Sequence, residues 1–248
     1  MKNQIKIVED LSLNAWPSHQ MQIYDGWILR FSHFYTHRTN CVEQIGPSMI
    51  PLQDKLDYCE EVYQKWGTPA IYKISPLLDS SFDQKLTQRG YHIAHLTEVM
   101  TQDLHTASQK APAYPIALYP CMSPQWLEAL FAMKGTSDPV HRRIVPSMYA
   151  AIPKDTIAAS AYDRGRIIGT GLAILDRDYA GIYAIHVHKD YRGRGIGCSI
   201  CQALLNASME QGAAHAYLQV VKGNAPAKNL YASLGFEDFY TYWFRQQY

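Results

Sequence analysis

A strand that leads through a glycine-rich loop into a helix constrains the fold of this chain more than any other part of its sequence. The extended run of residues 181–188 is followed by three glycines in five positions, Gly193, Gly195 and Gly197. These glycines let the backbone turn tightly, so that its N–H groups converge at the start of the helix. Converging amides and the helix dipole both favour an anion, which predicts a phosphate or pyrophosphate site.

The residues around these glycines narrow the kind of phosphate site. Arg192 and Arg194 would add charge-assisted hydrogen bonds to phosphate oxygens. A Walker loop needs Lys and then Ser or Thr after its last glycine, whereas Cys198 and Ser199 follow Gly197. A dinucleotide fingerprint would lie on the first strand of a βαβ repeat, and this loop does not. Both of these common phosphate loops are therefore excluded.

The spacing of Arg192, Gly195 and Gly197 is that of the RxxGxG motif of the GNAT superfamily of acyl-CoA-dependent N-acyltransferases. Residues 224–236, NAPAKNLYASLGF, resemble the next helix of that superfamily. The resemblance covers about residues 155–240, where loop, helix, strand and second helix follow in the family's order. It implies acetyl-CoA as the co-substrate and no metal.

The resemblance also implies a role for individual residues. In the family the loop amides hold the CoA pyrophosphate, the preceding strand splays to pair with the pantetheine arm, and a tyrosine of the later helix faces the thiol. Tyr231 becomes the acid that protonates the departing thiolate, since a phenol with a pKa of about 10 is protonated at neutral pH. The residues expected to bind acetyl-CoA are Val187, His188, Arg192, Gly193, Arg194, Gly195, Ile196, Gly197 and Asn224.

The general base is a separate question, because many family members carry a carboxylate on the strand before the loop and this strand offers Tyr183, His186 and His188. Alternation along a strand puts His186 and His188 on the same face. The pair could serve as a base, a metal site or plain sheet surface. We expect His186 to be the catalytic base and no metal to be bound; a water chain is the alternative path for the proton.

The first half of the chain resembles bacterial two-domain GNAT proteins, whose first half is a reduced relative of the second. Residues 24–30 and 36–40 carry this likeness. An internal match agrees with it, since residues 86–91 and 231–236 both end a helix with a glycine, an aromatic residue and an extended run. No glycine loop precedes the helix expected at Leu52, and Leu86 stands where Tyr231 does. The first copy is therefore expected to lack the chemistry.

We expect the first half to form one wall of the acceptor pocket. Trp27, Arg30 and Tyr183 are the candidate substrate contacts, with Arg38 as a further one. The competing interpretation is that Trp27 belongs to the core and that the arginines are solvated.

The expected fold class is α+β, a GNAT-like mixed and mostly antiparallel sheet flanked by helices, in two related domains. Residues 1–110 would form a degenerate domain without the CoA loop, and residues 111–248 the catalytic domain. Residues 105–115, rich in Ala, Ser, Gln and Pro, are the expected linker. The main helices are expected at residues 52–66, 82–89, 123–134, 142–151, 197–211 and 225–234, with strands between them.

Composition excludes several classes of partner. The 23 basic and 22 acidic residues nearly cancel, which predicts no binding to nucleic acid or to an anionic membrane. No long apolar run or signal-like start is present, so we expect a cytoplasmic protein. The five cysteines are an odd, scattered set, and the pair Cys198 and Cys201 fits either zinc or redox chemistry or a plain helix. The plain helix is favoured because no second pair of zinc ligands is evident.

The sequence thus predicts an N-acetyltransferase that moves acetyl from acetyl-CoA to a primary amine of a small molecule by direct attack. A peptide or protein amine is the alternative acceptor, and a longer acyl group the alternative donor. A CoA-binding regulatory module without catalysis is the rival class, which the missing strand carboxylate favours. A homodimer is left open.

Overall fold

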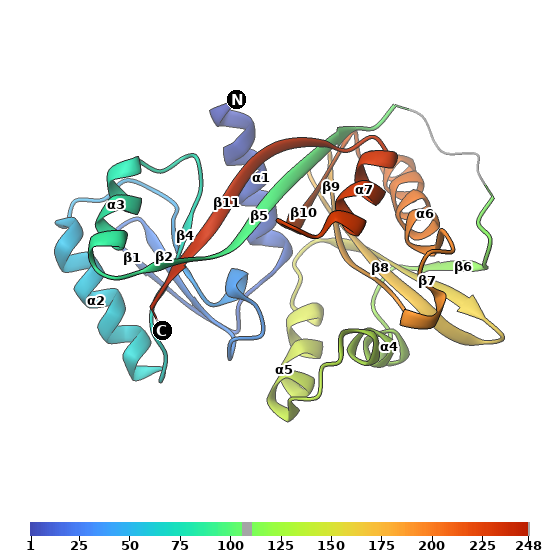
Figure 1. Ribbon diagram of the computed structural model, residues 1–248, viewed down its shortest axis with the longest axis horizontal. Coiled ribbons are helices and arrows are strands. Elements are labelled where there is room, and N and C mark those ends of the chain that lie inside the picture. The colour runs from blue at the N-terminus through green and yellow to red at the C-terminus, as the bar shows by residue number, and fades with distance from the viewer. Residues whose placement is uncertain (106–110, 248) are drawn as a thin grey trace.

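The computed structural model describes residues 1–105 and 111–247. Its architecture is α+β, as expected: within the described residues eleven strands form one mixed, mostly antiparallel sheet that seven α-helices flank (Figure 1). The strands are β1 (Gln20–Tyr24), β2 (Trp27–Phe31), β3 (Val42–Gln44), β4 (Ile71–Ile74), β5 (His92–Asp103), β6 (Ile116–Tyr119), β7 (Asp155–Asp163), β8 (Arg166–Asp176), β9 (Tyr179–Val187), β10 (His215–Val221) and β11 (Glu237–Gln246). The helices are α1 (Lys2–Ala15), α2 (Leu52–Lys65), α3 (Ser80–Gln88), α4 (Pro124–Lys134), α5 (Pro139–Ala150), α6 (Ile196–Glu210) and α7 (Ala225–Ser233), with short 3-10 turns at His37–Thr39 and Lys189–Tyr191.

The order of strands across the sheet is β1-β2-β3-β4-β11-β5-β10-β9-β8-β7-β6. Read from each edge towards the middle, the two halves of the sheet have the same pattern. β3 and β4 form a parallel pair in the first half, as β9 and β10 do in the second, and β11 and β5 lie antiparallel in the middle. Figure 1 shows β5 and β11 crossing the centre side by side. The sheet thus has an approximate internal two-fold symmetry.

The internal match seen in the sequence corresponds to matching backbone geometry. The Tyr91 amide donates to the Leu86 carbonyl at 3.0 Å, and the Phe236 amide donates to the Tyr231 carbonyl at 3.1 Å. Each of these helix ends leads into one of the two central strands, β5 and β11.

The two central strands are exchanged between the halves. β5 follows the first copy's helix but pairs with β10 of the second, and β11 follows the second copy's helix but pairs with β4 of the first. A division into domains at residue 110 stays a prediction, and the hydrogen bonding of the sheet does not follow it. Pairing across the middle of the sheet joins both halves into one sheet.

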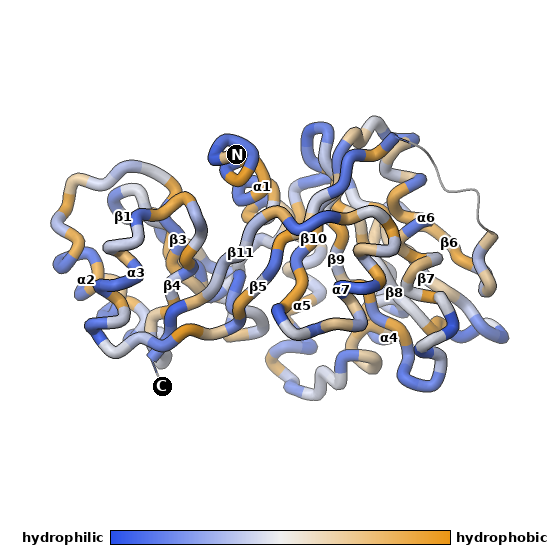
Figure 2. The backbone as a smooth tube through the Cα atoms, turned by 45° about the horizontal axis from the view of Figure 1, so that its top comes forward, coloured by the Kyte–Doolittle hydropathy of each residue, from blue (hydrophilic) through white to orange (hydrophobic). Residues whose placement is uncertain are grey.

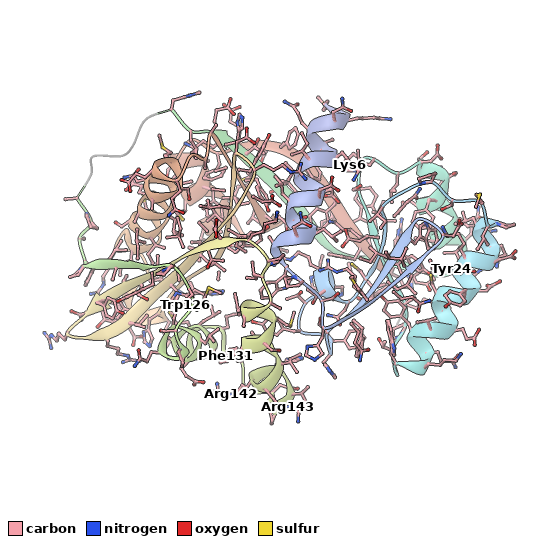
Figure 3. The ribbon with its side chains drawn as sticks, turned by 180° about the vertical axis from the view of Figure 1, so that it is seen from behind. Lys6, Tyr24, Trp126, Phe131, Arg142 and Arg143 are labelled. Carbon is pink, nitrogen blue, oxygen red and sulfur yellow. The ribbon has the colours of Figure 1, made fainter. Side chains whose placement is uncertain are left out.

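The helices cover the sheet of the second half on both faces. α6 packs on β7, β8 and β9, and its apolar residues are visible in Figure 2. On the other face α4 packs on β8 and β9, and Figure 3 shows Trp126 and Phe131 on α4, with Arg142 and Arg143 on α5 at the outer edge of the molecule. β9 therefore lies between helices on both of its faces.

Helix α1 is an element that the sequence analysis did not predict. Ile5, Val8, Leu11 and Ala15 recur every three or four residues and are buried. The first three pack on β10 and β11, while Ala15 and the following Trp16 lie against α4 and α5. The helix thus ties the start of the chain to the second half.

Within the described residues no helix has the length and apolar character needed to cross a bilayer. The same residues include no group of three or more His, Cys, Asp or Glu side chains arranged to hold a metal ion. Of the CxxC pair, Cys201 lies on the buried face of α6, where burial raises the pKa of its thiol. Both cysteines are parts of an ordinary helix.

Candidate active site

The glycine-rich loop presents a row of unpaired amides. Gly193 and Gly195 have φ of +75° and +74°, in the left-handed region that glycine adopts without strain. Gly195 is the N-cap of α6, and no side chain caps the helix. The backbone N–H groups of residues 193–198 find no acceptor in the part of the chain that the structure describes. A helix start with so many free donors is built for an anion.

A cleft of about 610 Å³ extends from this loop between the end of β9 and α7. Most of the residues expected to bind acetyl-CoA line it. The lining residues are Ile185, Val187, Tyr191, Arg192, Gly193, Gly195, Ile196, Gly197, Cys198, Asn224, Pro226, Ala227, Leu230 and Tyr231.

Two of the expected cofactor residues lie elsewhere. The His188 side chain accepts a hydrogen bond from the Asp190 amide at 3.4 Å, which caps the 3-10 turn, and it does not line the cleft. The Arg194 guanidinium donates to the Tyr114 hydroxyl at 3.3 Å and lies over the Tyr191 ring. Arg194 therefore contributes its backbone to the loop, while its side chain points to neighbouring aromatic rings.

The strand before the loop separates from its neighbour. β9 and β10 are paired only from Tyr179 to Ile182 on β9, although β10 continues to pair with β5 as far as Val221. The backbone of residues 183–187 therefore has β8 on one side and a gap on the other. This is the splayed strand that the family resemblance implied.

A β-bulge accompanies this splay. Tyr183 lies opposite Leu172 and His186 opposite Thr170, so β9 has one extra residue at this point, and Ala184 has a positive φ of +51°. The bulge turns Tyr183 and His186 to the same face of the sheet, where both line a cavity. Ile185 and Val187 point the other way, into the cleft.

The end of β9 at Val187 corrects the predicted pairing of His186 and His188. Strict alternation would place them on one face, but β9 ends at Val187, and the His188 ring turns to the 3-10 turn. The two histidines therefore do not form one site.

The second cavity, on the face of β9 opposite the cleft, has a volume of about 100 Å³ and adjoins a third of about 280 Å³. We call the two together the acceptor cavity; they share Tyr35, Thr36 and Arg38, which come from the first half. Other lining residues are Trp16, Leu130, Lys134, Tyr149, Leu172, Ile174, Tyr183, Ala184 and His186 in the smaller part and His37, His95, Thr97, Gln219, Val221, Tyr242 and Phe244 in the larger. The first half thus forms one wall of this cavity.

The two expected catalytic side chains lie on opposite sides of β9, and both are held uncharged. Burial raises the pKa of Tyr231, and the nearby Cys201 raises it further. The Tyr231 hydroxyl has no hydrogen-bond partner within the described residues, so it is free to meet a ligand in the cleft. Burial, together with the positive charges of Lys134 and Arg192, lowers the pKa of His186 to about 4.

Two expected substrate contacts, Trp27 and Arg30, line neither the cleft nor the acceptor cavity. Trp27 is 2% exposed in the core of the first half, with the Lys55 ammonium over its ring. Arg30 is 3% exposed and pairs with Glu43 at 3.3 Å. The core interpretation of Trp27 is the right one, and Arg30 is neither solvated nor free for substrate. Of the expected contacts, Tyr183 and Arg38 do line the acceptor cavity.

The equivalent helix start in the first half is closed by the chain itself. The Asp25 carboxylate accepts hydrogen bonds from the amides of Met49 and Ile50, at 3.0 and 2.9 Å, just before α2. These hydrogen bonds lower the pKa of Asp25, and Lys55 pairs with the same carboxylate at 3.3 Å. An internal anion therefore fills the position where the second copy leaves its amides open.

Most residues of the acceptor cavity were missed by sequence reasoning, among them Trp16, Tyr35, Lys134 and Tyr149. These four come from the end of α1, a loop, the end of α4 and α5, and none belongs to a motif. Only the long-range packing of these elements brings them together.

Free loop amides, a splayed parallel pair of strands and a tyrosine on the following helix together define the GNAT class of N-acetyltransferases. Comparison with known proteins agrees with this class. The chain belongs to the family described as probable histone acetyltransferase Rv0428c C-terminal, whose model matches residues 2–244. A Bacillus subtilis (strain 168) protein named uncharacterized N-acetyltransferase YobR is 24% identical over 237 residues, 94% of this chain and 95% of that protein.

Solved structures share the fold. A GCN5-related N-acetyltransferase from Kribbella flavida superposes with a TM-score of 0.70 at 14% identity, over 100% of this chain and 95% of that one. A tandem GNAT protein from the clavulanic acid biosynthesis pathway superposes with a TM-score of 0.65 at 15% identity, over 84% of this chain and 74% of that one. The chain is thus a GNAT-family N-acetyltransferase, a membership that implies the use of acetyl-CoA.

Proposed function

We propose that this protein transfers acetyl from acetyl-CoA to the primary amine of a small molecule by direct attack. The observation that carries the proposal is the placement of two cavities on opposite faces of β9, beside the gap between β9 and β10. One suits an acyl donor and the other an acceptor, and the gap lets the two meet. The small volume of the acceptor cavity supports a small acceptor over a folded protein.

The cleft fits acetyl-CoA by its donors as well as its shape. The unpaired amides of residues 193–198, with Arg192 beside them, would hold the pyrophosphate. Asn224 and the backbone of Val187 would contact the pantetheine arm. What acetyl-CoA supplies when bound is a thioester whose carbonyl carbon is open to attack by an amine.

The residues around the gap would divide the proton transfers. As the bond from nitrogen to the acetyl carbon forms and the bond from carbon to sulfur breaks, Tyr231 gives its proton to the departing thiolate. Its raised pKa keeps the phenol protonated at neutral pH, so the proton is available. Backbone N–H groups of β9 that face the gap would stabilise the negative charge on the carbonyl oxygen.

His186 would serve the amine. Its imidazole is neutral at pH 7, because its pKa is about 4, and it can accept a hydrogen bond from the attacking nitrogen. The same low pKa makes it a weak proton acceptor, since a general base works best with a pKa near the working pH. We therefore assign His186 the role of orienting the amine, and water accepts the proton that the amine loses.

The test is mass spectrometry of a pooled library of amines and amino acids incubated with the protein and acetyl-CoA. Tyr231→Phe should lower kcat by about a hundredfold or more and leave acetyl-CoA binding intact, because it removes only the proton donor. Tyr119→Phe, at an exposed tyrosine on the edge strand β6, is the matched control. Acetyl-CoA binding without any acetylated product would instead indicate a CoA-binding module.

A further inference from the structure

Two cations face the acceptor cavity without a carboxylate. Arg38 and Lys134 both line it, and neither forms an ion pair with any described residue. Within the described residues no Asp or Glu lines either part of the cavity. The excess is local, because the whole chain has a formal net charge of only +1.

The buried cations among the described residues, by contrast, all have carboxylate partners. Lys73 pairs with Glu9 at 2.9 Å and also with Glu43, and Arg245 pairs with Asp83 at 2.7 Å. Arg30 and Lys55 have carboxylate partners as well. Arg38 is half-buried and Lys134 is exposed, but both line the same cavity without a carboxylate. A cavity lined by charges of one sign attracts a ligand of the opposite sign, so these two cations indicate a negatively charged ligand.

Neutral neighbours hold the Arg38 guanidinium in place. Its Nη1 donates to the Gln219 side-chain oxygen at 2.7 Å, and the group lies 5.8 Å from the centre of the Tyr183 ring. The Tyr242 hydroxyl donates to the same Gln219 oxygen at 3.1 Å. The Gln219 side-chain nitrogen is buried and has no acceptor. The remaining guanidinium donors of Arg38, which lines both parts of the cavity, are therefore available to an acceptor atom there.

Lys134 approaches from the opposite wall. Its ammonium donates to the Tyr35 hydroxyl at 2.7 Å and lies 4.4 Å from the centre of the Tyr35 ring. Burial of this ammonium, and then the charge of Arg38, lower the pKa of Lys134 to about 8. Arg38 and Lys134 line the same small cavity, so both cations act on whatever occupies it.

We infer that the acceptor is a small zwitterionic amine whose carboxylate is bound by Arg38 and Lys134, while its amine points to His186 and the gap in the sheet. This inference rests on the proposed transfer and adds the chemical class of its substrate. A carboxylate suits the planar fork of a guanidinium, which can bind both of its oxygens. Trp16, Tyr35 and Tyr149 would enclose its side chain, and a polycationic acceptor would be repelled.

The experiment compares matched acceptors. L-amino acids, their primary amides, the corresponding decarboxylated amines and the corresponding aminophosphonates are each assayed with acetyl-CoA for kcat and KM. Calorimetry of the same compounds with CoA-loaded protein measures binding without chemistry. Both are repeated with Arg38→Gln and Lys134→Gln, and with Lys65→Gln, an exposed lysine on α2, as control.

Amino acids should exceed their amides and decarboxylated amines in kcat/KM by about tenfold to a hundredfold, as expected for hydrogen bonds to a charged group. Arg38→Gln and Lys134→Gln should remove this preference mainly through KM, and Lys65→Gln should keep it. Because Lys134 is exposed at the end of α4, its variant tests the inference even if Arg38→Gln does not fold.

Other outcomes separate the two proposals. Equal or better turnover of the amides or the decarboxylated amines, or a preference for the phosphonates, overturns the carboxylate inference and leaves the transferase proposal standing. If no amine is acetylated, amino-acid binding that Arg38→Gln weakens still supports the carboxylate site and counts against the transfer. Absence of such binding overturns the inference.

Discussion

Substitution of Gly195 by alanine tests whether the backbone shape of the loop, and not the space around it, positions the amides for acetyl-CoA. Gly195 has φ +74° and ψ 2°, and a Cβ added there would have nothing within 4 Å. The cost is therefore that of the left-handed backbone, about 1–2 kcal/mol for an L-residue. Gly212, beyond the other end of α6, also has a positive φ of +93° and equally open surroundings, so Gly212→Ala is a matched control.

The structure predicts where this cost appears. If the free loop keeps its shape in Gly195→Ala, the unfolding free energy of the free protein falls by about 1–2 kcal/mol. If the free loop relaxes, the same cost returns when CoA binds, and Kd rises by about five- to thirtyfold. The two losses should add up to about 1–2 kcal/mol. Gly212→Ala should lose stability alone and bind CoA with unchanged affinity.

The assay is urea unfolding with and without saturating CoA, combined with calorimetric titration of CoA. No loss in either quantity for Gly195→Ala would refute the backbone argument. A loss of affinity well beyond a hundredfold would show that the new methyl group enters the ligand's space. Equal weakening of CoA binding in Gly212→Ala would show that the loop has no special role.

Three further substitutions follow from the structure. The pKa of His186 is lowered from 6.5 to about 4, so between these pH values the unfolded chain binds more protons than the folded one, and the wild type loses stability as the pH falls from 6.5 towards 4. His186→Gln should flatten this dependence in urea unfolding curves measured over a series of pH values. An unchanged slope of stability against pH contradicts the assignment. Glu43→Gln leaves the buried Arg30 without its counterion and should lower the unfolding free energy by about 3 kcal/mol, whereas exposed Glu61→Gln should change it little. Leu11→Ala should lower the unfolding free energy by about 2–4 kcal/mol if α1 belongs to the core. A loss below about 1 kcal/mol in the same unfolding assay would show that α1 contributes little to the core.

The parts of the site that were predictable from the sequence are those that depend on neighbours in the chain. The loop from Arg192 to Gly197 is encoded locally, because a glycine pattern sets backbone angles directly. The expected position of Tyr231 on the next helix depends on spacing alone, and the structure places it in the same cleft.

The acceptor cavity was not predictable in the same way. Trp16 follows α1 in the first half and Lys134 ends α4 in the second, and only the packing of α1 against α4 and α5 brings them to one cavity. β9 ends at Val187, so the alternation on which the pairing of His186 and His188 was based does not reach His188. The bulge at Ala184, which puts Tyr183 and His186 on one face, was not predicted either. Neither a bulge nor a distant contact leaves a periodic signal in a single sequence.

The exchange of β5 and β11 has a consequence for how such a chain can evolve. If the two halves were separated, β10 would lose its neighbour β5 and β4 would lose β11, and each half would expose an unpaired strand edge that invites aggregation. Selection can therefore let the first copy decay as a binding site, filling its helix start with Asp25, while retaining it as a structural partner. Because the exchanged strands hold both halves in one sheet, the first half can lose its binding site and still be required for the fold.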